Sequence, residues 1–262
     1  MSDIEERVHR LERMRIERER LARIMDEDLL ETVEEVFDRL TLLSLYDLVN
    51  DGVIDVMHGV VSSGKEARVY WAEDPEGNDL AVKIYLTMTA EFRHGMLKYI
   101  EGDPRFQHVR RHPRKLIYLW CRKEFRNLKL AYETGIRVPK PIAARNNILV
   151  MEFINQPNER GRPAPLLREA PPEDPEEALE VLFGYMHKLY NEAELVHADL
   201  SEYNVMNREG ELIIIDWGSA VKKGHPMFTE FLLRDIRNVL RFFHKLGVKV
   251  PSVREVFEWI TH

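Results

Sequence analysis

The chain has 262 residues, of which 44% are hydrophobic and 32% are charged, and its formal net charge is -7. This composition supports a real core in one or two domains, and the negative charge gives no bulk attraction to nucleic acid or to an anionic membrane surface. The single cysteine excludes an intrachain disulfide framework and an all-cysteine zinc site, and no apolar run reaches transmembrane length. We therefore expect a cytoplasmic protein with no membrane partner and no DNA partner.

Residues 1–50 are predicted to form a helical N-terminal segment that packs on the domain C-terminal to it. Residues 4–28 are dense in both charges and have only a broken apolar stripe. This pattern favours a solvated helix or a frayed tail over a coiled-coil partner arm. Apolar residues recur at helical spacing over 29–50, and Asn50-Asp51-Gly52 ends that second helix.

Residues 59–74 predict two strands joined by a turn. Gly59, Gly64 and Lys65 have the spacing of a nucleotide-binding P-loop. However, Glu66 stands where that loop needs Ser or Thr, and a strand follows in place of a helix. The stretch therefore indicates either a strand–turn–strand cover over phosphates or an ordinary hairpin turn. The candidate phosphate contacts are Ser62, Ser63 and Lys65.

Lys83 lies in the middle of the apolar strand 80–85, where an unpaired ammonium group is costly. The strand therefore predicts an anion beside Lys83, namely phosphates and a carboxylate from a helix. Glu124 is the candidate, because it borders the apolar face of a helix predicted over 113–134. The alternatives are a lysine that snorkels from an edge strand and a glutamate exposed on the surface.

An insertion at about 86–112 is rich in basic residues with interleaved aromatic residues. It is predicted either as a nucleic-acid contact or as a mobile solvated loop or short helix, and the residues do not decide between these. The buried strand 147–154 resembles one that leaves a kinase N-lobe through the hinge. There, backbone groups near Glu152 to Ile154 bind adenine and Met151 guards the pocket.

Residues 156–175 are predicted to be a linker, because proline, arginine and glutamate dominate them. Three helices are predicted to follow the linker, at 174–191, 225–246 and 252–261.

The candidate catalytic and metal-binding residues lie in residues 195–221. There Asp199 follows an apolar pair, and Asn204 comes five residues later. Asp216 ends the next apolar strand. Phosphoryl transfer requires positioning and charge neutralisation, and Mg²⁺ takes oxygen ligands. The pattern predicts that Asp199 orients or deprotonates an attacking hydroxyl, and that Asn204 and Asp216 bind Mg²⁺. Turn capping is the alternative role of such residues.

Several stretches taken together resemble the RIO family of atypical serine/threonine protein kinases, from about residue 35 to residue 250. They are SSGKEA at 62–67, AVKIY at 81–85, HADLSEYN at 197–204 and Ile215-Asp216, while YIEGDPRF at 99–106 is similar to the first RIO subfamily. The resemblance implies an α+β fold, the trimmed bilobal protein-kinase-like fold. Residues 51–154 would form an N-lobe of antiparallel sheet plus helix, and residues 155–262 a mainly helical C-lobe.

The resemblance also implies binding of ATP with Mg²⁺ or Mn²⁺, with Asp199 as catalytic base and Asn204 and Asp216 as metal ligands. Lys83 paired with Glu124 would hold the phosphates. Asp216 is implied as the second catalytic residue, because in this family the metal-binding aspartate also becomes a phospho-aspartate, which gives an ATPase cycle. The implied partner is the pre-ribosomal small subunit, both protein and rRNA, during its maturation.

The chain departs from ordinary protein kinases in two ways. Ala198 and Ser201 replace the usual Arg and Lys, and only the seven residues 219–225 separate Gly218 from Pro226, which leaves no room for an activation segment. Free peptides are therefore expected to be poor substrates. Two other functions compete with a RIO kinase: a small-molecule kinase of the aminoglycoside or choline class, and a noncatalytic, nucleotide-switched module that binds RNA or the ribosome.

Overall fold

The computed structural model describes residues 37–86, 90–106 and 113–262, together with six positions closer to the N-terminus. Those six are Arg15, Ile16, Glu19, Leu21, Ile24 and Met25. The predicted helix at 4–28 and the first part of the predicted helix at 29–50 therefore lie largely outside the described residues. The second part is observed as α3 (Arg39–Asn50).

A five-stranded antiparallel sheet forms the first lobe, in the order β1-β2-β3-β5-β4. Its strands are β1 (Val56–Ser63), β2 (Ala67–Glu73), β3 (Asp79–Tyr85), β4 (Pro141–Arg145) and β5 (Ile148–Glu152). Alternate side chains of a strand point to opposite faces of the sheet. Val82 and Ile84 therefore share a fully buried core with residues of α3, whereas Lys83 between them faces the second lobe.

Polar contacts at both ends of α3 fix this helix on the sheet. Asp38 caps its first turn by accepting a hydrogen bond from the Thr41 amide, and the same carboxylate pairs with Arg114. At the other end Arg145 of β4 pairs with Asp47 and Asp51 at 2.6 and 2.7 Å. The cap satisfies amides that a helix start leaves without partners.

The insertion at 86–112 is structured wherever it is described. It contains α4 (Ala90–Ile100) and the short 3₁₀ turn η1 (Pro104–Phe106), so the short helix is confirmed for these residues, while the nucleic-acid contact stays a prediction. Tyr99 and Phe106 are buried in the main core. Gly102 lies so close to Pro226 that a Cβ atom there would approach the proline ring to 2.6 Å. The helix predicted at 113–134 is α5 (Pro113–Glu133).

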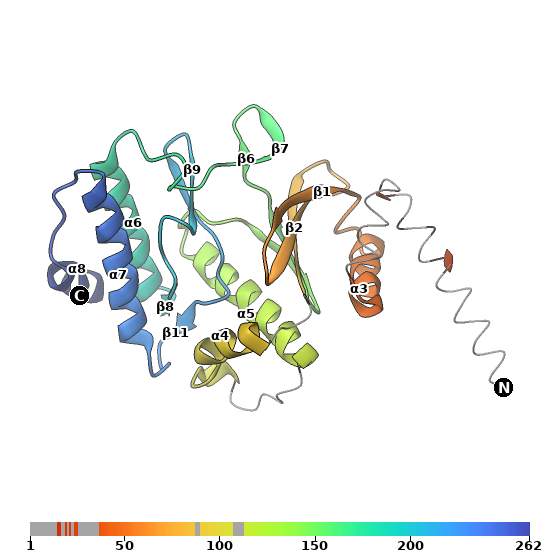
Figure 1. Ribbon diagram of the computed structural model, residues 1–262, viewed down its shortest axis with the longest axis horizontal. Helices are drawn as coiled ribbons and strands as arrows, with labels where there is room; N and C mark the ends of the chain where they lie inside the picture. Colours follow the sequence, from red (N-terminus) through yellow and green to blue (C-terminus); the bar gives the residue numbers. More distant parts are fainter. Residues whose placement is uncertain are drawn as a thin grey trace.

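The predicted linker at 156–175 is wrong for its first part, because β6 (Asn155–Gln156) and β7 (Glu159–Pro163) form a hairpin there. Long-range contacts give this polar stretch its structure. Asn155 and Arg160 both donate hydrogen bonds to the Asp79 carboxylate of β3, the first at 2.7 Å and the second at 2.8 Å. The hairpin is therefore fastened to the first lobe although it follows the hinge (Figure 1).

The second lobe is mainly helical, with short strands between its helices. Its elements are α6 (Pro175–Asn191), β8 (Leu195–Val196), β9 (Val205–Arg208), β10 (Glu211–Ile214), β11 (Val221–Lys222), α7 (Phe228–Lys245) and α8 (Val253–Thr261). The three helices begin and end within three residues of their predicted bounds. They lie together at the end of the molecule opposite to α3 (Figure 1).

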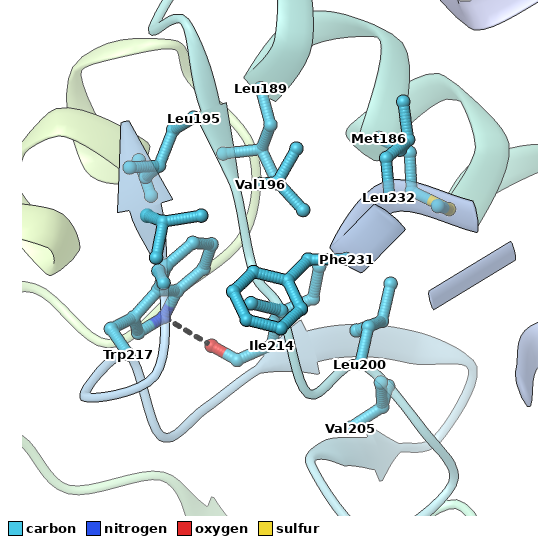
Figure 2. Packing of buried hydrophobic residues seen from close by; sticks show 14 of the residues in the cluster. Met186, Leu189, Leu195, Val196, Leu200, Val205, Ile214, Trp217, Phe231 and Leu232 are labelled. Carbon is cyan, nitrogen blue, oxygen red and sulfur yellow. Dashed lines mark hydrogen bonds between the residues drawn. The ribbon is translucent and has the colours of Figure 1, made fainter. Parts of the chain in front are cut away.

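The core of the second lobe surrounds the segment that carries the candidate catalytic residues. Trp217 is 1% exposed, and its indole nitrogen donates to the Ile214 carbonyl at 3.2 Å (Figure 2). Phe231 of α7 and Val196 of β8 belong to the same cluster. Apolar burial of this extent anchors the loops that emerge from the strands. Within the described part of the chain, no helix combines the length and the apolar character needed to cross a membrane.

Gly161 provides a test of the hairpin's attachment to the first lobe. It has a φ of +78°, and a Cβ atom there would lie 2.7 Å from the Trp71 ring. Gly77 has almost the same φ, +79°, but open space around it. Since both alanine variants carry the same backbone strain, we expect Gly161→Ala to lower the free energy of unfolding by about 1–3 kcal/mol more than Gly77→Ala, measured by urea denaturation. Equal losses would show that the hairpin is not held against Trp71.

Candidate active site

A cleft of about 790 Å³ lies between the lobes, and most of the predicted site residues line it. These are Ser62, Lys65, Lys83, Met151, Glu152, Ile154, Asp199, Asn204 and Asp216. Two predicted residues do not line it. Ser63 lies at the end of β1, opposite Arg68, and Glu124 is buried behind Lys83 with 1% of its side chain exposed.

Lys83 joins the two lobes through its ammonium group. Its Nζ atom donates to both carboxylate oxygens of Glu124 on α5, at 2.9 and 3.1 Å, and to Oδ1 of Asp216 at 2.9 Å. Burial alone would lower the pKa of Lys83, but the two carboxylates outweigh it and the net pKa is raised. Burial raises the pKa of Glu124 to about 7 despite its lysine partner. The ammonium group is therefore a fixed positive charge at the base of the cleft.

Asp199 and Asn204 both line the cleft and are held together by hydrogen bonds. The Asn204 amide nitrogen donates to the Asp199 carbonyl at 2.8 Å and to its Oδ2 atom at 3.3 Å. This arrangement leaves the Asn204 amide oxygen available as a ligand. Desolvation in the cleft raises the pKa of Asp199, and repulsion from Asp216 adds to the effect. A carboxylate with a raised pKa is suited to accept a proton from a hydroxyl group.

Asp216 has an unusual backbone conformation, with a φ of 64°. A residue other than glycine in this region carries strain, which the surrounding structure must balance. The neighbouring Ile215 provides part of that restraint, because its amide donates to the Asn204 carbonyl at 3.0 Å and its carbonyl accepts from the His197 ring at 3.0 Å. The ammonium group of Lys83 lowers the pKa of Asp216, which is therefore ionised.

Asp235 holds the loop that carries Asp199, and sequence analysis did not identify it. Its two carboxylate oxygens accept hydrogen bonds from the amides of Ala198 and Leu200, at 2.7 and 3.0 Å. Ala198 has a φ of 64°, and the Arg234 guanidinium donates to its carbonyl. Burial raises the pKa of Asp235 to about 8. An acid on the apolar face of α7 was the sequence signal that could have revealed this role.

In the hinge region, main-chain groups rather than side chains are available to bind a ligand. Arg137 occupies the Glu152 carboxylate at 2.7 and 2.9 Å, and the Lys140 amide donates to the same group at 3.0 Å. The Ile154 carbonyl accepts from Ala164. Among the described residues, the Ile154 amide meets no acceptor. The side chain of Glu152 is therefore structural. The amides of Glu152 and Phe153 donate to Lys140 and Asp79, so the Ile154 amide is the hinge donor that the described residues leave free to bind a base.

The donor set of the cleft fits magnesium that is shared with a nucleotide. The described residues contain no group of three or more His, Cys, Asp or Glu side chains placed to bind a metal ion by themselves. Asn204 and Asp216 offer one amide oxygen and one carboxylate. Mg²⁺ usually takes one or two carboxylates and completes its octahedron with phosphate oxygens and water. The pair therefore fits Mg²⁺ as it binds with a triphosphate.

Comparisons with known proteins agree on one family. A family model described as the RIO domain matches residues 68–256. The chain is 44% identical over 239 residues to the RIO-type serine/threonine-protein kinase Rio1 of Haloferax volcanii, covering 91% of this chain and 80% of that protein. It is 43% identical over 233 residues to the serine/threonine-protein kinase RIO1 of Caenorhabditis elegans, covering 87% of this chain and 45% of that protein.

A solved structure shares the fold at low sequence identity. The Rio2 kinase-ADP/Mg²⁺-phosphoaspartate complex from Chaetomium thermophilum matches with a TM-score of 0.66 and 21% identity, covering 86% of this chain and 68% of that one. The predicted trimmed bilobal kinase-like fold is thereby confirmed. Because the family model covers most of the chain and the archaeal relative is similar over most of both proteins, the chain belongs to the RIO family of atypical serine/threonine protein kinases.

Proposed function

We propose that this RIO kinase transfers the γ-phosphoryl group of ATP in the cleft between its lobes. The observation that carries the proposal is the position of the Lys83 ammonium group, 2.9 Å from both the Glu124 and Asp216 carboxylates. A lysine of one lobe and a metal-binding acid of the other then act on the same phosphates. Phosphoryl transfer depends mainly on such positioning and charge neutralisation.

The remaining residues take roles along the nucleotide. The free Ile154 amide and the main-chain carbonyl of Glu152 bind the adenine, and Met151 closes the inner end of that pocket. Ser62 and Lys65, in the turn between β1 and β2, cover the phosphates. Asn204 and Asp216 hold Mg²⁺, or Mn²⁺ in its place, which neutralises charge on the phosphates. Ser63 was predicted to share the phosphate contact, but it lies outside the cleft lining.

Two acceptors are compatible with this arrangement. In the first, the hydroxyl oxygen of a serine or threonine attacks the γ-phosphorus and ADP leaves. Asp199 takes the proton of that hydroxyl. In the second, an Asp216 oxygen attacks the γ-phosphorus and ADP leaves, and water then releases inorganic phosphate from the phospho-aspartate. This second route would make the protein an ATPase. The related Rio2 kinase complex, which contains ADP, Mg²⁺ and a phosphoaspartate, supports this second route.

We propose the pre-ribosomal small subunit, through its protein and rRNA, as the partner in the cytoplasm. The support is the family resemblance together with the short segment that follows Gly218. Between Gly218 and the start of α7 at Phe228 the chain forms only β11 and turns, so it offers no platform for an extended peptide. A substrate must then be presented by a separate surface.

Alanine substitutions of the two acids separate their proposed roles. Asp216→Ala should abolish Mg²⁺-dependent nucleotide binding, because the metal loses its carboxylate ligand. Asp199→Ala should retain much of that binding while transfer falls about 10²–10⁴-fold, the usual contribution of a general base. Calorimetry with Mg²⁺–ADP and mass spectrometry of phosphate on the protein measure the two effects. Full autophosphorylation by Asp199→Ala would refute its role as the base, whereas a wild type that binds Mg²⁺–ADP and acquires no phosphate from ATP would favour a nucleotide-switched binding module.

Removal of the Lys83 amine should destabilise the fold in a pH-dependent way. Lys83→Met leaves Glu124 buried without its cation, which costs about 3–5 kcal/mol of unfolding free energy. Because burial holds the pKa of Glu124 above its unfolded value, the folded variant retains a proton that the unfolded chain releases. Its stability should therefore fall as the pH rises from about 5 to 8.

The control is the double variant Lys83→Met/Glu124→Leu, which removes the buried charge and should recover most of the lost stability. Denaturation of the wild type and both variants at several pH values provides the measurement. A pH-independent loss that the second substitution does not reduce would contradict the pairing.

The absence of a peptide platform predicts how turnover depends on the substrate. Hydrolysis of ATP should rise when precursor small ribosomal particles are added, and remain near its basal rate with free serine-containing peptides. Mature large subunits, which carry a comparable density of RNA phosphate, serve as the control. Rapid phosphorylation of free model peptides would count against this prediction.

A further inference from the structure

Lys123 is a fully buried lysine that the proposed chemistry does not use. It lies next to Glu124 on α5 and has no exposed surface. Its ammonium group donates hydrogen bonds to the main-chain carbonyls of Gly218 and Ala220. Within the described residues, no carboxylate lies within ion-pair distance of it. A buried ammonium group costs several kcal/mol unless its surroundings compensate, so the two carbonyls that accept from Lys123 must be held in place for it.

Asn127 lies one turn further along α5 and binds the same segment. Its amide nitrogen donates to the carbonyls of Trp217 and Ala220 at 2.9 and 2.8 Å. Lys123 and Asn127 together therefore bind three carbonyl groups in the four residues that directly follow Asp216. Of these three, the Ala220 carbonyl accepts from both side chains.

The segment from Trp217 to Ala220 packs directly on α5. A Cβ atom on Gly218 would lie 2.9 Å from the Trp120 ring, so only glycine allows this approach. Within the segment itself the Ala220 amide donates to the Trp217 carbonyl at 3.3 Å. Since Asp216 has a strained backbone, its position depends on contacts that come from outside the loop. Donors on α5 supply them.

We infer that Lys123 and Asn127 are positioning residues that hold the Asp216 loop in the geometry required to bind Mg²⁺. This inference rests on the proposed function. The same helix then acts on Asp216 from two sides, through Glu124 and Lys83 at its carboxylate and through Lys123 and Asn127 at the main chain that follows it.

The YIEGDPRF motif at 99–106 orients Asn127 within this network. The Arg105 guanidinium donates to the Asn127 amide oxygen at 2.8 Å and pairs with Asp103 at 2.7 Å. With its oxygen occupied by Arg105, the Asn127 amide presents its nitrogen to the two carbonyls. The turn after α4 therefore supports the metal site without lining it.

The test is Lys123→Met, which keeps the aliphatic stem and removes the donors. The Mg²⁺ concentration for half-maximal nucleotide binding should rise about tenfold, as expected when two hydrogen bonds that favour the binding geometry are lost. Nucleotide affinity measured in EDTA should remain unchanged, because the hinge contacts are distant. Amide hydrogen exchange at 217–220 should be faster. Asn127→Ala removes the other two bonds and should shift the same quantities, so it provides the test if the first variant does not fold.

Leu128→Ala is the matched control, because Leu128 is fully buried on the same helix and makes none of these hydrogen bonds. It should lower the melting temperature and leave the Mg²⁺ requirement at the wild-type value. If Lys123→Met lowers only the melting temperature, as the control does, the inference is wrong. Calorimetry with Mg²⁺ and nucleotide measures this shift without any phosphoryl transfer. A wild type that binds Mg²⁺ and nucleotide but transfers no phosphoryl group would refute the proposed function and leave this inference standing.

Discussion

One ammonium group between two carboxylates defines the geometry of this protein. The Lys83 ammonium group belongs to the sheet of the first lobe and contacts Glu124 on α5 and Asp216 in the second lobe. Its burial is favourable only while both acids remain in place, since a buried charge without partners costs far more than a paired one. The separation of the lobes is therefore fixed by the same contacts that assemble the candidate phosphate site.

The loops around that site are restrained by contacts from distant parts of the chain. Ala198 and Asp216 both have left-handed backbones, and neither is a glycine. Asp235 binds the amides on both sides of Asp199, while α5 binds the main chain after Asp216. Strained conformations persist when several interactions determine them together. The candidate site is thus preorganised by contacts from other elements, with only β11 and turns between Gly218 and α7.

The sequence was sufficient to predict structure where a local pattern determines an element or where a charged residue in an apolar strand requires a partner. An unpaired lysine in an apolar strand predicted the contact of Lys83 with Glu124. Local sequence patterns predicted the three helices of the second lobe within three residues. It was insufficient where a partner distant in the sequence determines the structure. Asp79 turns the predicted linker into a hairpin by binding Asn155 and Arg160. Asp235 and Lys123 lie on apolar helix faces, and only the fold reveals which main-chain groups they bind.

Helix α5 connects these observations. Its side chains hold the carboxylate of Asp216 through Lys83 and the carbonyls after Asp216 directly, and Arg105 connects the helix to the insertion. A displacement of the helix would therefore weaken the lysine pair and the metal loop together, because both depend on consecutive turns of one rigid element. Both sets of contacts are therefore coupled through α5, so a displacement of the insertion would act on Lys83 and on the Asp216 loop together.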